Sequence, residues 1–126
     1  MAASGKRVAA NAVIAGIFLI GLAYLGVPEQ LGAHPRWAMK VSYIGIGLGV
    51  VIYSLAWVWQ SGWVAKFILF AVLAVISGVG ATFGKSRFAA SFAEDALAGQ
   101  LWYFGWIAVF GFVFALLMHL MSLRRE

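Results

Sequence analysis

The chain has 126 residues, of which 64% are hydrophobic and only 10% are charged. Soluble domains are about 45 to 50% apolar and about 25% charged, so this composition excludes an ordinary soluble globule. Disordered chains have low hydropathy, and the mean hydropathy of +0.97 excludes this class as well. We therefore expect an integral membrane protein.

Charge and cysteine content exclude further classes. The formal net charge is +5, which on a soluble protein favours a nucleic-acid partner. Here the basic residues flank long apolar runs, as they do where lysine and arginine anchor spans to lipid head groups, so we expect no nucleic-acid binding. The chain has no cysteine, which excludes disulfides, zinc thiolate sites, iron–sulfur clusters and cysteine nucleophiles.

Four long runs without charged residues divide the sequence. A helix needs about 20 apolar residues to cross a hydrocarbon core of about 30 Å, so each run is long enough for one crossing. Helices satisfy their own backbone in lipid, and the runs lack the strict alternation of barrel strands. We predict a single all-α domain over 1–126, a polytopic bundle of four transmembrane helices with up-down-up-down topology. The spans are expected at about 8–27, 39–59, 63–84 and 99–122.

The first two connections between the runs differ in length. Residues 27–37 include Pro28 and Pro35, which we expect to stop helices. The second and third runs are joined only by residues 60–63, so we expect these two helices to be antiparallel neighbours.

The third connection carries a helix-start signal. Ser91 and Glu94 have the spacing of a capping box, in which each side chain bonds a backbone N–H of the first turn. This spacing predicts that the fourth helix begins near Phe92, beyond the membrane. In the alternative interpretation of this segment, Phe88 and Phe92, which are one turn apart, lie in the plane of the head groups.

Aromatic and basic residues mark the two membrane faces. Trp57, Trp59 and Trp63 fall at one face, and the other face has Tyr24, Trp37, Trp102 and Tyr103. Four crossings place both termini on one side. That side has Lys6, Arg7, Lys66, Arg124 and Arg125, against Arg36, Lys40, Lys85 and Arg87 on the other. The small excess favours cytoplasmic termini, and we expect the membrane to be a bacterial inner membrane.

Small residues recur four positions apart in three of the spans. The pairs are Ala12 with Gly16, Gly45 with Gly49, and Gly80 with Gly84. Helices in lipid associate through close packing, which such stripes permit. We predict that these six residues pack helices together, either inside this bundle or against another protein.

Residues able to bind a metal or cofactor are few. His119 lies within a span, and His34 is predicted at the opposite face about 30 Å away, so the two cannot share a haem. An interfacial histidine is favoured over an axial ligand or a quinone contact at His119. His34 shares its face with Glu29, Glu94 and Asp95, but their spacing matches no compact metal site. We expect no metal and no cofactor.

No predicted span has a charged residue in its middle, where proton relays and substrate sites place one. We therefore predict a non-enzymatic accessory subunit or assembly factor that acts through helix packing, with lipids and another membrane protein or further copies of itself as partners. The alternative is a small homo-oligomeric transporter or channel. An enzyme of lipids or quinones is disfavoured because no nucleophile and base are paired in sequence. The channel would be lined by Tyr53, Ser54, Ser77 and Thr82.

Overall fold

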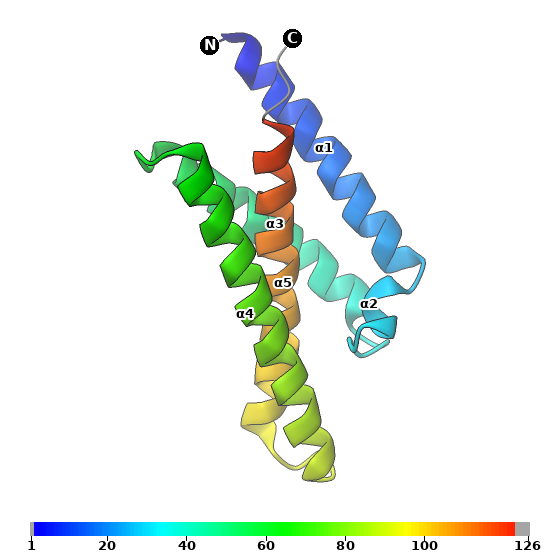
Figure 1. The fold of residues 1–126 in the computed structure, drawn as a ribbon. Helices are drawn as coiled ribbons and strands as arrows, with labels where there is room; N and C mark the ends of the chain where they lie inside the picture. The colour runs from blue at the N-terminus through cyan, green and yellow to red at the C-terminus, as the bar shows by residue number, and fades with distance from the viewer. Residues whose placement is uncertain (1, 123–126) are drawn as a thin grey trace.

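The computed structural model describes residues 2–122, which form four long helices and one short helix (Figure 1). The long helices are apolar and pack against one another, which confirms the predicted all-α, four-helix architecture. The helices are α1 (Ala2–Tyr24), α2 (Val27–Gln30), α3 (Ala38–Val58), α4 (Trp63–Ala90) and α5 (Ala96–Met121).

Each long helix contains a segment long and apolar enough to cross a membrane, of 20, 21, 28 and 26 residues in chain order. Length and composition thus indicate an integral membrane protein. The first turns of α1 and the last turns of α5 lie at the same end of the bundle, which we call the terminal end (Figure 1). The turn between α4 and α5 lies at the opposite end. Helix α4, with 28 residues, is about 42 Å long, so it extends past the hydrocarbon core.

Helix α5 is the centre of the fold, because α1, α3 and α4 all pack on it. In its apolar segment 44% of the residues are buried, against 11% in α4. Helix α4 therefore has one protein neighbour of consequence and exposes most of its circumference.

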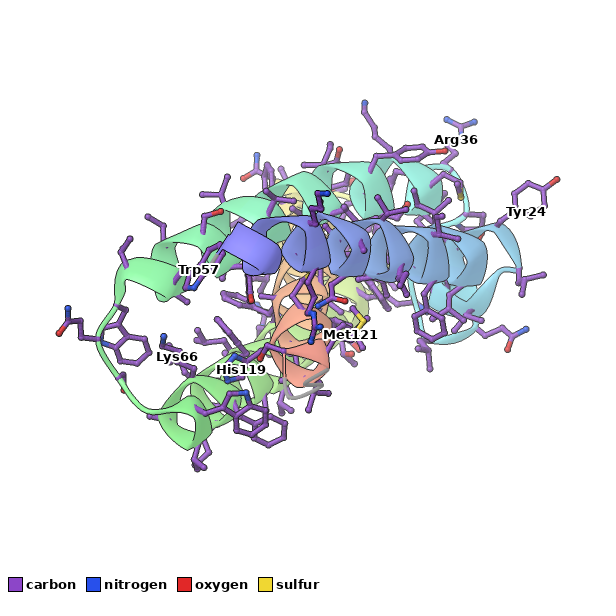
Figure 2. The ribbon with its side chains drawn as sticks, turned by 90° about the horizontal axis from the view of Figure 1, so that it is seen from above. Tyr24, Arg36, Trp57, Lys66, His119 and Met121 are labelled. Carbon is purple, nitrogen blue, oxygen red and sulfur yellow. The ribbon has the colours of Figure 1, made fainter. Side chains whose placement is uncertain are left out.

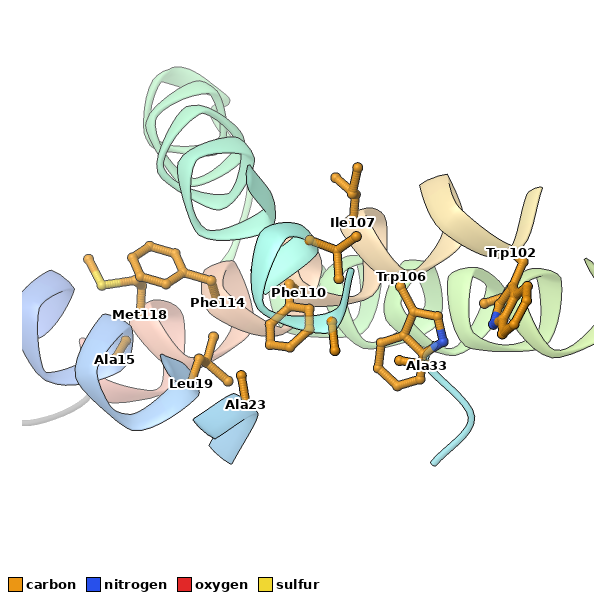
Figure 3. Close-up of a cluster of buried hydrophobic side chains, with 13 residues drawn as sticks. Ala15, Leu19, Ala23, Ala33, Trp102, Trp106, Ile107, Phe110, Phe114 and Met118 are labelled. Carbon is orange, nitrogen blue, oxygen red and sulfur yellow. The ribbon is translucent and has the colours of Figure 1, made fainter. Parts of the chain in front are cut away.

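The main core lies between α1, α3 and α5 (Figure 3). Ala15, Leu19 and Ala23 are spaced four residues apart and form the buried stripe of α1. They belong to one cluster with Phe114 and Met118 of α5, both almost fully buried. The two alanines of this stripe thus leave room for the large side chains of α5.

Helices α3 and α4 are not packed neighbours, so the expectation drawn from their short connection is wrong. The two helices diverge from residues 59–62 and each packs on α5 (Figure 1). The connection reaches between them because Trp59 and Gly62 have extended backbones, with ψ of 122° and 163°. Four extended residues span up to about 13 Å, which is more than the separation of packed helices.

The helix start predicted from Ser91 and Glu94 is also wrong, although the Ser91 half of the capping box forms. Helix α4 continues to Ala90, and Ser91 caps its end instead of starting α5. The Ser91 hydroxyl accepts hydrogen bonds from the N–H groups of Glu94 (3.2 Å) and Asp95 (2.9 Å). Asp95 is the cap of α5, and its carboxylate accepts from the N–H of Ala98 at 3.0 Å. Phe92 and Ala93, the residues at the predicted start, have positive backbone φ angles. They therefore lie outside a right-handed helix.

The first connection contains a short helix. Helix α1 ends at Tyr24, and Gly26 adopts a φ of 85°, which redirects the chain into α2. Pro28 lies in the first turn of α2, where its missing N–H has no partner to lose. One of the two prolines expected to stop helices therefore begins one.

Candidate functional site

One tight helix contact involves Gly45 and Gly49 of α3, which lie against the backbone of α5. A Cβ at Gly45 would lie 2.8 Å from the carbonyl oxygen of Ile107 and would overlap the Cβ of Phe110. A Cβ at Gly49 would lie 2.7 Å from the Cβ of Phe114. Only glycine lets the two helices approach this closely.

The contact between α4 and α5 also depends on glycine, in a register shifted from the predicted one. A Cβ at Gly84 would lie 2.6 Å from the backbone nitrogen of Trp102, whereas the nearest atom at Gly80 is 3.8 Å away. Gly105 of α5 fits against Ala81, whose Cβ would be 2.8 Å from an added Cβ. The tight face of α4 therefore contains Ala81 and Gly84. Gly105 was not predicted, because no small residue stands four positions from it.

The two small residues predicted on α1 lie in different surroundings. Ala12 is partly buried against the main core. An added Cβ at Gly16 would meet no atom within 4 Å. Thus Ala12, Gly45, Gly49 and Gly84 pack inside the bundle, while Gly16 and Gly80 make no tight contact in it.

His119 joins the end of α5 to the beginning of α4. Its side chain is 6% exposed, and its ring stacks on that of Trp63 at 4.5 Å between centroids. Nε2 of His119 donates to the carbonyl oxygen of Trp63 at 2.8 Å, and Nε1 of Trp63 donates back to the carbonyl oxygen of His119 at 3.2 Å. The Ser122 hydroxyl accepts from the same Nε1 at 3.2 Å. We call this arrangement the His119–Trp63 clamp.

A cavity of about 190 Å³ lies beside the clamp at the terminal end, where α3 and α4 diverge over α5. We call it the interfacial cavity. Its lining is mainly polar, and three of the lining residues, Trp57, Lys66 and His119, are labelled in the view from above (Figure 2). The lining includes Tyr53, Trp57, Lys66, Phe70, His119 and Ser122.

At the opposite end, His34 belongs to an aromatic cluster. Its ring centroid is 5.5 Å from that of Trp102, and its Nδ1 accepts from the N–H of Arg36 at 3.0 Å. Trp102 in turn donates its Nε1–H to the carbonyl oxygen of Gly32 at 2.9 Å, which fastens the first connection to α5. Asp95 is used as a helix cap. Within residues 2–122 no three His, Cys, Asp or Glu side chains group closely enough to hold a metal ion.

The hydroxyl groups considered for a channel lining are spread over the bundle. Ser54 and Ser77 each donate, at 2.8 Å, to a carbonyl four residues earlier in their own helix. Thr82 is exposed on α4, and Tyr53 lines the interfacial cavity. These four side chains form no common polar stripe.

The geometry thus offers tight glycine contacts inside the bundle, a broad exposed face on α4 and one polar cavity. Comparison of the chain with protein-family models, with curated proteins and with solved structures gives no match.

Proposed function

We propose that the protein is a non-enzymatic accessory subunit or assembly factor that binds another integral membrane protein through the outer face of α4. The observation that carries this proposal is that α4, within residues 2–122, has only one extensive helix contact, which is with α5. The side of α4 turned away from α5 is a continuous apolar surface within the membrane. A second transmembrane protein would complete the burial of this helix.

The outer face of α4 has residues suited to helix packing. Its seven apolar side chains are 47 to 65% exposed and recur at helical spacing, so they form one stripe. Six of the seven are β-branched and therefore stiff at χ1, so they lose little freedom when a partner packs on them. Helix association in lipid depends on such packing, because lipid tails are as apolar as the side chains. The stripe consists of Val64, Ile68, Val72, Val75, Ile76, Val79 and Phe83.

Tryptophan substitutions test which face binds the partner. In the variant Val75→Trp/Val79→Trp two bulky side chains project from the outer face of α4. The matched control Val13→Trp/Ile17→Trp carries the same change, at the same spacing, on the exposed face of α1. We expect blue-native electrophoresis of mildly solubilised membranes to show the wild type and the α1 variant in a larger complex, and the α4 variant released from it.

Two results would contradict the proposal. One is a wild-type protein that migrates as a lone 13.6 kDa species without partner bands. The other is an α4 variant that stays in the complex as fully as the α1 variant. Mass spectrometry of the larger band separates the alternatives, because a band made only of this chain indicates a homo-oligomer.

A homo-oligomeric transporter or channel has weaker structural support than the accessory subunit. Its proposed lining would need polar groups on one face, whereas Ser54 and Ser77 bond to their own helices. Flux of ions, protons or small organic cations through reconstituted liposomes would favour this alternative.

We also propose a bacterial inner membrane as the location, with the terminal end in the cytoplasm. The chain has no native cysteine, so single cysteines report topology cleanly. Gln60 is exposed at the terminal end and Gln30 at the opposite end, which makes them a matched pair. We expect a membrane-impermeant maleimide to label Gln30→Cys in intact cells, and Gln60→Cys only after permeabilisation. The reverse pattern would place the terminal end outside.

A further inference from the structure

The interfacial cavity contains hydrogen-bond donors without acceptors. Lys66, Tyr53 and Trp57 line it, and none of the three has a side-chain hydrogen bond to any residue in 2–122. Nε1 of Trp63 and the Ser122 hydroxyl, by contrast, are used in the His119–Trp63 clamp. An ammonium, a phenol and an indole N–H are thus available to one ligand that accepts hydrogen bonds.

Within residues 2–122 no carboxylate lies near the cavity. The carboxylates in the described part of the chain are Glu29, Glu94 and Asp95, and all three lie at the opposite end of the bundle. Lys66 is partly buried and lies in the first turn of α4, whose cap Gly62 offers no side-chain acceptor. The free N–H groups of that turn add to the positive potential, and a partly buried cation without a counter-ion favours binding of an anion.

The position of the cavity favours a lipid as the source of that anion. Trp57 of the lining, and Trp63 stacked on the lining residue His119, are of the residue type that gathers at head-group depth. At the same site a small apolar cluster of Ala56, Phe70 and Ala115 lies between α3, α4 and α5, with partly buried apolar side chains around it. Because α3 and α4 diverge and this cluster is apolar, the acyl chains of a bound lipid are expected to lie along it. A volume of about 190 Å³ is below the usual range for whole ligands, about 300 to 1,000 Å³, and suits a head group alone.

We propose that the interfacial cavity binds the phosphate head group of an anionic phospholipid, with Lys66 as its charge partner and Tyr53 and Trp57 as further donors. The acyl chains lie outside the cavity, between α3 and α4. This site does not depend on the outer face of α4 and stands separately from the proposed docking function.

Lipid titration of the purified full chain tests the site. Native mass spectrometry measures binding of phosphatidylglycerol and of phosphatidylcholine with identical acyl chains. We expect the wild type to prefer the anionic lipid by about tenfold, because the choline cation of phosphatidylcholine offsets the phosphate charge that Lys66 binds, whereas phosphatidylglycerol has no such cation. Lys66→Gln is expected to abolish this preference, and Lys66→Arg to retain it. Lys85→Gln is the matched control, because it removes the same charge from the opposite end of α4.

A second measurement follows Lys66 in the wild type and needs no variant. Acylation of lysine side chains, read by peptide mass spectrometry, is expected to be slowed by phosphatidylglycerol at Lys66 and not at Lys85. Equal protection of Lys66 by inorganic phosphate alone would identify a free-phosphate site and overturn the lipid assignment. Unchanged lipid preference in Lys66→Gln, or equal loss in Lys85→Gln, would overturn the site itself.

Discussion

Gly45→Val is expected to destabilise the protein by about 3 kcal/mol, because α3 then has to separate from α5. The new Cβ would overlap the Cβ of Phe110 and lie 2.8 Å from the carbonyl oxygen of Ile107. A backbone atom cannot rotate away as the end of a flexible side chain can. Unfolding of the detergent-solubilised protein by added sodium dodecyl sulfate, followed by tryptophan fluorescence, measures the loss.

Gly47→Val is the matched control on the same helix. The change in helix propensity is the same as at Gly45, because both variants replace glycine by valine in one helix. An added Cβ at Gly47 meets no atom within 4 Å, so the collision is absent. We expect its unfolding midpoint to stay close to that of the wild type. Equal midpoints for the two valine variants would show that α3 does not pack on α5 through Gly45.

His119→Ala is expected to cost about 3 kcal/mol, since it combines a cavity with the loss of a buried hydrogen bond. The carbonyl oxygen of Trp63 loses its donor at 2.8 Å, and the indole ring loses the imidazole stacked on it at 4.5 Å. The beginning of α4 would then separate from the end of α5. The same unfolding titration measures the effect.

Trp63→Phe is the companion variant for the clamp. It keeps an aromatic ring against His119 but removes the N–H that donates to the His119 carbonyl and to Ser122. We expect a smaller loss of about 1 kcal/mol. A stable His119→Ala protein would rule out the clamp, and an absorbance band that disappears with the imidazole would instead show that His119 binds a cofactor.

The four helices could be predicted from sequence because lipid imposes a local requirement. Each run must be apolar over its whole length and must satisfy its own backbone, so hydropathy alone locates it. Helix ends beyond the lipid follow a different rule. Helix α4 continues to Ala90 past Lys85 and Arg87, since charged side chains in water do not interrupt a helix.

The partners of each helix could not be predicted in the same way. Gly45, Gly47 and Gly49 alternate along α3 and look equivalent in sequence, yet an added Cβ at Gly47 is unobstructed while Cβ atoms at the other two collide with α5. Which face is buried depends on where α5 lies. The short connection at residues 59–62 limited the distance between α3 and α4 without fixing their contact. Similarly, His119 and Trp63 are 56 residues apart and share no motif.

The central position of α5 has a consequence for biogenesis. Ribosomes synthesise the chain from α1 onward, so α5 is made after the three long helices that pack on it. Until then α4 is in the bilayer without its main partner, with the glycine face that will receive Trp102 turned toward lipid. The contacts between α4 and α5, the most extensive in the bundle, therefore form only after the rest of the helices have been made.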